Sequence, residues 1–251
     1  MDFVKGEIFV IDKPYRWTSF DAVKRLRGAI QRRLGVKKFK VGHAGTLDPL
    51  ATGVLIVCTG AATKRIDSLQ AGEKEYVATL QLGATTPSFD LEKEIDAVFP
   101  TGHITRDLIE ETLGKFRGKI MQVPPIFSAV KIDGKRAYKY ARKGDEIELK
   151  AKPLEITELE LLEFTPGGNA TEDGESIIRP EMKIRVVCSK GTYIRALARD
   201  IGEALRSGAH LTALRRTRVG EMNLANALTI DEAIKLVDEC DLPPAEESEL
   251  K

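Results

Sequence analysis

The stretch VGHAGTLDPLATGVL, residues 41–55, contains one acidic residue, Asp48, directly before Pro49. Proline fixes the backbone angle φ, and the glycines allow the backbone of another molecule to approach closely. The apolar run at 54–58 has the length and composition of a buried strand. Because a catalytic group must be held rigidly, the stretch predicts a lone carboxylate on a stiff turn at the edge of a packed strand.

Outward from this stretch, hydrophobic spacing and capping residues predict helices and strands in irregular alternation. Strands are expected at 7–11, 54–58, 76–82, 154–164 and 177–188. Helices are expected from Thr18 or Ser19 to Gly35, at 61–69, from Thr105 to Gly114, at 137–143, from Thr192 to Leu205 and after Thr229. Neighbouring strands in the second half of the chain favour an α+β class with a mixed sheet over a regular parallel fold.

Charge is segregated along the chain, although the 39 basic and 38 acidic residues nearly cancel. Residues 22–47 contain several lysines and arginines and no acid, residues 190–218 are rich in arginine, and residues 238–251 are mainly acidic. A single basic run is as often a solvated helix face as a phosphate contact. Two such runs around the polar motifs favour a surface that binds phosphates.

Motifs for metal or cofactor chemistry are missing. The three histidines and three cysteines are too few and too scattered for a metal site, and no phosphate-binding glycine motif occurs. Ser128 to Lys131 matches SxxK, but its companion motifs are absent, which makes chance the better explanation. We therefore expect chemistry without a metal or cofactor, carried by a carboxylate acting as nucleophile or base.

The compartment follows from cysteine use and hydropathy. The cysteines form no CxxC pair, which is typical of reduced thiols. No apolar stretch is long enough to span a membrane, and the N-terminus does not resemble a signal peptide. We expect the protein to act in the cytoplasm.

Several motifs, in order, resemble those of TruB-type tRNA pseudouridine synthases. They are Asp12-Lys13-Pro14 with Thr18-Ser19, the catalytic loop at 42–55, Lys74-Glu75-Tyr76, the segment 188–195, the segment 208–216, and a tRNA-facing insertion at 122–131 and 140–144. Together they span residues 8 to about 235. The catalytic loop alone is highly specific, and the ordered set leaves little room for coincidence.

This resemblance implies the pseudouridine synthase fold, a mixed and mostly antiparallel sheet flanked by helices. It implies one catalytic domain over 1–237 with an insertion near 100–150 that grips tRNA, followed by an acidic tail at 238–251. Most TruB-like enzymes continue into an RNA-binding PUA domain, which we do not expect here. The implied activity is isomerisation of uridine 55 in the T loop of tRNA by a monomer that needs no metal or cofactor.

The resemblance also assigns the catalytic residues. Asp48 would promote cleavage of the glycosidic bond between C1′ and N1, either by attacking the sugar or by deprotonating it. Tyr76 would stack on the uracil and help remove its C5 proton. Arg195 would pair with Asp48 and keep the carboxylate charged and aimed.

Substrate contacts are assigned in the same way. Tyr193 and Leu214 would line the uridine pocket, and His43 would help fill the stack that the flipped base leaves. Lys13 belongs to the same set, close to the site and in a structural role. A non-catalytic RNA binder or tRNA folding helper, and a pseudouridine synthase for another RNA, remain as alternatives.

The chain departs from the family pattern at a few positions. Arg16 stands where the first motif usually has glycine, and Phe127 stands where tyrosine is more usual. A stretch of the Thr-x-Thr-x-Asp type survives only as Thr86, Ser88 and Asp90, so no role is assigned to Asp90.

Overall fold

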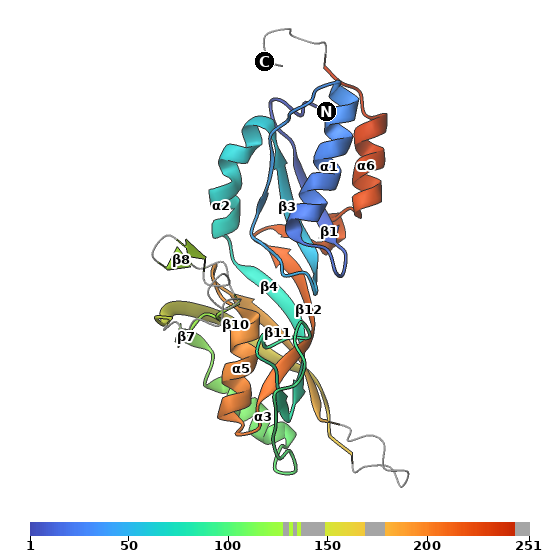
Figure 1. Ribbon diagram of the computed structural model, residues 1–251. Helices are drawn as coiled ribbons and strands as arrows, with labels where there is room; N and C mark the ends of the chain where they lie inside the picture. Colours follow the sequence, from blue (N-terminus) through green and yellow to red (C-terminus); the bar gives the residue numbers. More distant parts are fainter. Residues whose placement is uncertain (128–130, 133–134, 137–148, 169–178, 244–251) are drawn as a thin grey trace. The chain divides into compact units, whose positions relative to one another are not determined.

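The computed structural model describes residues 1–127, 131–132, 135–136, 149–168 and 179–243. The chain divides into two compact units: unit 1 is Met1–Glu75 with Arg215–Lys251, and unit 2 is Tyr76–Leu214. The chain passes between the units within β4 (Lys74–Leu82) and again within β12 (Ala209–Val219) (Figure 1). Among the residues described, no helix combines the length and apolar character needed to cross a membrane.

Unit 1 is built around a long buried strand. Its elements are β1 (Ile8–Lys13), α1 (Ser19–Leu34), β2 (Val41–Ala44), β3 (Ala51–Thr59), the 3-10 helix Gly60–Arg65, α2 (Ile66–Ala71), β13 (Met222–Asn223), the 3-10 helix Leu224–Asn226 and α6 (Ile230–Glu239). β3 pairs antiparallel with both β1 and β2. In Figure 1, α1 and α6 lie side by side, and their apolar stripes share one core cluster.

The ends of α1 explain where the catalytic loop is anchored. Thr18 is the N-cap and forms a capping box with Asp21, and Gly35 closes the helix in the left-handed conformation, as predicted. Ser19 therefore does not cap the helix. Its hydroxyl instead donates to the carbonyl oxygen of Leu47 at 3.1 Å and accepts from the Leu47 amide at 2.8 Å. These two bonds tie the residue before Asp48 to the start of α1.

Unit 2 contains the paired strands of the second half of the chain. Its further elements are β5 (Ala84–Thr85), β6 (Ala97–Val98), α3 (Arg106–Gly114), β7 (Gly118–Gln122), β8 (Lys131–Ile132), β9 (Lys135–Arg136), β10 (Lys152–Thr165), β11 (Glu181–Cys188) and α5 (Ile194–Ala204). β10 pairs antiparallel with β11 and with β7. Thr105 caps α3 through the amide of Leu108, which confirms the predicted start of that helix. The mixed helices and antiparallel pairings confirm the α+β class.

Three local predictions need correction. The N-cap of α5 is Tyr193, not Thr192, whose hydroxyl donates instead to the carbonyl oxygen of Ser189 at 2.9 Å. β2 was predicted as part of a loop, and β12 was not predicted at all. β12 reads AHLTALRRTRV, so its basic side chains hide the alternation that marks a strand. The predicted helix at 137–143 lies outside the described residues.

Candidate active site

Asp48 lies in unit 1, between β2 and β3. Its carbonyl oxygen accepts from the amide of Ala51 at 3.1 Å, which closes a tight turn over Pro49 and Leu50. The Asp48 residue is half-buried, and the first residue of β3 is fully buried. The carboxylate thus stands on a short turn with both flanks anchored, at Leu47 by Ser19 and at Ala51 by the strand.

Lys13 is fully buried at the end of β1. Its ammonium donates to three main-chain carbonyl oxygens, those of Pro14 at 3.0 Å, Trp17 at 2.5 Å and Pro49 at 3.3 Å. Burial lowers the pKa of Lys13 to about 8, against the opposing effect of the Asp48 charge. The buried charge therefore joins the turn before α1 to the turn that carries Asp48.

Arg216 holds the same loop from the other side. It is 1% exposed, although it stands in an arginine-rich stretch. Its Nε donates to the carbonyl oxygen of Val54 at 2.7 Å, and its Nη2 donates to that of Gly45 at 3.0 Å. A Cβ on Gly53 would lie 2.1 Å from the Arg216 carbonyl oxygen, so only glycine fits there. The sequence assigned no role to Arg216; the glycines on both sides of Asp48 were the signal that another chain segment comes close.

His43 lies on β2, and its Nδ1 is buried. Within the described part of the chain this atom has no hydrogen-bond partner. Burial, and then the nearby charge of Arg216, lower the pKa of His43, so the ring is neutral near pH 7. A buried polar atom without a partner is costly and requires an explanation.

Arg195 lies in unit 2, in the first turn of α5, and is 5% exposed. Its Nη1 donates to the carbonyl oxygen of Ser88 at 3.1 Å and its Nη2 to that of Phe127 at 3.0 Å. Its Nε lies 3.6 Å from the carboxylate of Asp90, which is also buried. Asp90, to which the sequence assigned no role, is therefore an ion-pair partner of Arg195.

The remaining predicted site residues also lie in unit 2. Tyr76 is 8% exposed, on the buried side of the alternating strand β4. Tyr193 is half-buried, and its amide donates to the side chain of Gln122 at 2.9 Å. Leu214 is half-buried on β12. Unit 2 thus positions the aromatic and apolar candidates on β4, β12 and the start of α5.

Each unit gathers its own set of predicted residues. In unit 1, the charge of Asp48 acts on Lys13, and the charge of Arg216 acts on both Lys13 and His43. In unit 2, Arg195 is held by Asp90. The pairing of Asp48 with Arg195 joins a residue of one unit to a residue of the other and stays a prediction. Within the described residues, no cluster of three or more His, Cys, Asp or Glu side chains could hold a metal ion.

Two family profiles match consecutive parts of the chain. The profile of the TruB family pseudouridylate synthase N-terminal domain matches residues 31–194. The profile of the tRNA pseudouridylate synthase B C-terminal domain matches residues 195–242.

Curated relatives match over nearly the whole chain. The tRNA pseudouridine synthase B of Phocaeicola vulgatus is 63% identical over 239 residues, which cover 95% of this chain and 96% of the relative. The tRNA pseudouridine synthase B of Bacteroides thetaiotaomicron is 66% identical over 228 residues, 91% of each chain.

Solved structures match the fold. A chain in a crystal structure of a Cbf5-Nop10-Gar1 complex superposes with a TM-score of 0.65 at 29% identity, over 93% of this chain and 54% of that chain. A chain in an H/ACA RNP bound to a substrate RNA gives a TM-score of 0.62 at 27% identity, with the same coverage. This protein spans about half the length of those solved chains. The profiles, the relatives and the superposition confirm the pseudouridine synthase fold, and the chain belongs to the TruB family of pseudouridylate synthases.

Proposed function

We propose that this protein is a tRNA pseudouridine synthase that isomerises the uridine at position 55 of the T loop. Membership of the TruB family supports the reaction and the substrate. The observation that carries the proposal is the anchoring of the Asp48 turn by Ser19, Lys13 and Arg216. Such anchoring is what a group needs when it must meet one sugar carbon in a fixed orientation.

The reaction rearranges bonds within one nucleotide. The C1′–N1 bond breaks, the uracil turns, a C1′–C5 bond forms, and the proton leaves C5 while N1 ends protonated. Asp48 either attacks the sugar or removes a proton from it, and both routes need an ionised carboxylate. Tyr76 stacks on the uracil and assists the loss of the C5 proton. Arg195 pairs with Asp48 and orients it. Asp90 holds the guanidinium of Arg195 in place, which supports an orienting role.

The nucleotide must leave the folded loop before it can react. Extruding a base costs a few kcal/mol, which stacking and pocket contacts offset. Tyr193 and Leu214 line the pocket for the uracil, and His43 enters the vacated stack. The lowered pKa of His43 supports this role, because an uncharged imidazole ring can stack against bases. Lys13, fully buried, acts on the substrate only by shaping the Asp48 turn.

The partner is the T arm of tRNA, bound by a monomer in the cytoplasm. One catalytic domain over 1–237 carries the reaction, and an insertion near 100–150 grips the tRNA elbow. The basic runs at 22–47 and 190–218 support binding of a folded RNA through its phosphates.

Tritium release from a tRNA transcript labelled at C5 of uridine tests the proposal. The matched control is the same transcript with cytidine at position 55. We expect release of one tritium per tRNA from the first transcript and none from the control. Equal release from both would mean that another uridine is the target. Binding of both transcripts without any release would mean that the protein is an RNA binder and not an enzyme.

A further inference from the structure

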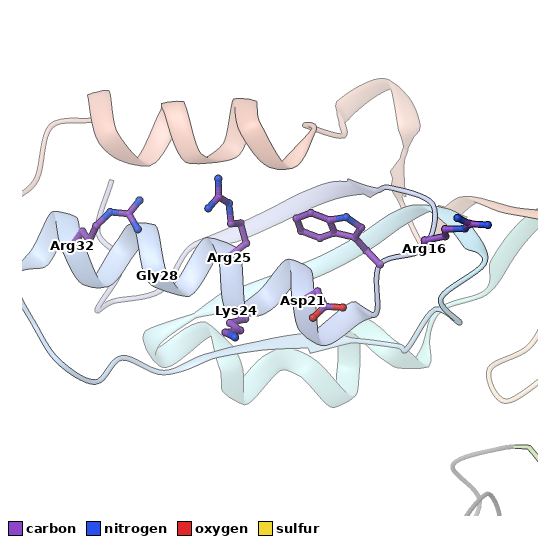
Figure 2. A pocket seen from close by; sticks show the side chains of 7 residues that line it. Arg16, Asp21, Lys24, Arg25, Gly28 and Arg32 are labelled. Carbon is purple, nitrogen blue, oxygen red and sulfur yellow. The ribbon is translucent and has the colours of Figure 1, made fainter. Parts of the chain in front are cut away.

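A groove of about 520 Å³ runs along the exposed side of α1 in unit 1. It begins at the turn before the helix and continues for about three turns of α1. Four of the side chains that line it are basic: Arg16, Lys24, Arg25 and Arg32. Figure 2 shows Arg25 and Arg32 projecting from the same side of the helix, with Gly28 between them and Arg16 beyond the N-terminal end.

The basic side chains of the groove are not used to hold the protein together. Among the residues described, Lys24, Arg25 and Arg32 form no side-chain hydrogen bond and no ion pair. The one acidic residue of the groove, Asp21, is committed to the helix cap, because its Oδ2 accepts from the amide and the hydroxyl of Thr18. The pKa of Asp21 is lowered by its hydrogen bonds to Thr18 and also by the charge of Lys24, so this carboxylate partly compensates Lys24. Among the residues described, Arg25 and Arg32 have no such ion-pair partner.

Gly28 opens the middle of the groove. Glycine weakens a helix interior relative to alanine, so its use there needs a reason. A Cβ at this position would meet only the Nη1 of Arg32, at 3.8 Å, so no packing of the protein requires glycine. What the glycine does provide is bare backbone between two guanidinium groups, where a bulky partner can approach closely.

Arg16 is a second sign of function. Its φ is +66°, in the left-handed region that favours glycine, and its side chain is exposed. Backbone strain of this kind is found at binding sites, where the side chain is needed despite its cost. The guanidinium of Arg16 lies 5.6 Å from the centre of the Tyr15 ring, and that of Arg27 lies 5.6 Å from the Phe20 ring. Tyr15 and Phe20 are 47% and 57% exposed. Exposed aromatic rings beside arginines are typical of surfaces that bind nucleic acid.

The groove is joined to the Asp48 turn. Lys13 donates to the carbonyl oxygen of Trp17, which lines the groove, and to that of Pro49, which follows Asp48. A strand held in the groove is thus held by the same rigid part of unit 1 that carries the carboxylate.

We infer that this groove binds the phosphodiester backbone of the tRNA substrate, as a contact separate from the one that holds the target uridine. The inference rests on the proposed function, since it takes the substrate to be RNA. Guanidinium groups pair with phosphate oxygens through two parallel hydrogen bonds, and Arg25 and Arg32 offer two such groups about 10 Å apart along the helix. The bare backbone of Gly28 lets the ribose-phosphate chain lie between them.

Salt-dependent binding of full-length tRNA tests the inference. The variant Arg25→Gln with Arg32→Gln loses two groove cations. The matched control, Lys5→Gln with Lys235→Gln, loses two exposed cations of unit 1 that form ion pairs with Asp2 and Glu239. Anisotropy titrations at several KCl concentrations would give log Kd against log salt. We expect the groove variant to bind about 10-fold more weakly in 0.1 M salt, with a slope shallower by about 1.5 to 2. The control should stay within about 2-fold of wild type, with an unchanged slope.

The variant also separates this inference from the proposed function. At tRNA concentrations well below Kd, the groove variant should release tritium about 10-fold more slowly than wild type, and this deficit should shrink as the tRNA concentration rises, because Arg25 and Arg32 only hold the RNA. If wild type releases tritium and the groove variant keeps the wild-type salt slope, the inference is wrong and the proposed function stands. If wild type binds tRNA through the groove but releases no tritium, the proposed function is wrong instead.

A pair of substitutions at Gly28 gives an independent readout. Gly28→Ala adds one methyl group, whereas Gly28→Glu adds a carboxylate to the groove. Both should raise the melting temperature, because both improve the helix. We expect Gly28→Glu to bind tRNA at least 5-fold more weakly than Gly28→Ala. Equal affinity of the two variants would exclude a phosphate at this place.

Discussion

Units 1 and 2 each bury positive charge, but they compensate it differently. In unit 1, Lys13 and Arg216 bond to main-chain carbonyl oxygens before and within the catalytic loop. In unit 2, Arg195 bonds to two carbonyl oxygens and also faces the carboxylate of Asp90. A buried charge needs such partners, because burial without them is strongly unfavourable. The buried charges of unit 1 therefore fix the backbone of the catalytic loop, whereas the ion pair of unit 2 fixes the side chain of Arg195.

The strongest test compares the carboxylates of the two units. Asp48→Asn should lower turnover by about 10⁴-fold or more, since it removes the reacting group. Its tRNA affinity should stay within a few fold of wild type. Single-turnover tritium release and a binding titration would measure both quantities.

Asp90→Asn is the matched variant in unit 2. It should lower turnover far less, because Asp90 acts only through Arg195. Asp67, exposed on α2, provides a neutral control for the loss of one acid in unit 1. Turnover by Asp48→Asn at a rate near that of Asp67→Asn would refute the assignment of Asp48.

The second test removes a buried cation of unit 1. Arg216→Met should lower the free energy of unfolding by about 3 kcal/mol, because it removes the guanidinium donors to the carbonyl oxygens of Gly45 and Val54. Turnover should fall as well, since the Asp48 turn loses an anchor. Urea unfolding followed by circular dichroism would measure the change.

Arg218→Met is the control on the same strand, where the arginine is only half-buried and bonds to Gly220. We expect it to cost less than about 1 kcal/mol. Equal destabilisation by the two variants would mean that the hydrogen bonds of Arg216 to the catalytic loop add no stability beyond that of any arginine on this strand.

The third test addresses Arg195. Arg195→Ala should lower kcat by about 10²-fold with little change in KM, because the guanidinium orients the catalytic carboxylate and does not grip the RNA. Steady-state kinetics with the T-arm RNA would separate the two constants. A rise in KM at constant kcat would show that Arg195 binds substrate instead.

The fourth test uses the pH dependence of stability, to which the buried lysine of unit 1 contributes. The pKa of Lys13 is lowered from 10.5 to about 8 in the folded protein. Between these values the unfolded chain binds more protons, so the contribution of Lys13 to stability rises with pH. We expect wild type to gain about 2 kcal/mol over Lys13→Met between pH 8 and pH 10. Urea unfolding of both proteins at each pH would measure the difference, and a constant difference would contradict the lowered pKa.

The smallest effect concerns one strained arginine in each unit. Arg16 has a φ of +66° and Arg206 a φ of +54°. Replacing either with glycine should raise the free energy of unfolding by about 0.5 to 1 kcal/mol, because glycine adopts this conformation without strain. Only Arg16→Gly should weaken tRNA binding, since only Arg16 lines the groove. Equal tRNA affinity of the two variants would show that Arg16 does not contact the RNA.

Local features of the sequence predicted much of the secondary structure. Thr18, Thr105 and Thr229 cap their helices as expected, because a capping hydroxyl acts on amides two or three residues away. The turn at Asp48 also followed from its neighbours, a proline and flanking glycines. The order of the motifs along the chain identified the family. An ordered set of motifs is specific to a family, whereas each of these residues alone is common in unrelated proteins.

Tertiary structure decided which of the charged residues are buried and what they hold. Arg216 contacts Val54 and Gly45 across more than 160 positions of sequence, and nothing local distinguishes it from Arg215 or Arg218. Asp90 became an ion-pair partner only because α5 brings Arg195 to it. Local patterns determine which residues form helices and turns, because those interactions span a few residues. The burial of a charge depends on which distant segments pack around it. Only the tertiary structure determines this packing.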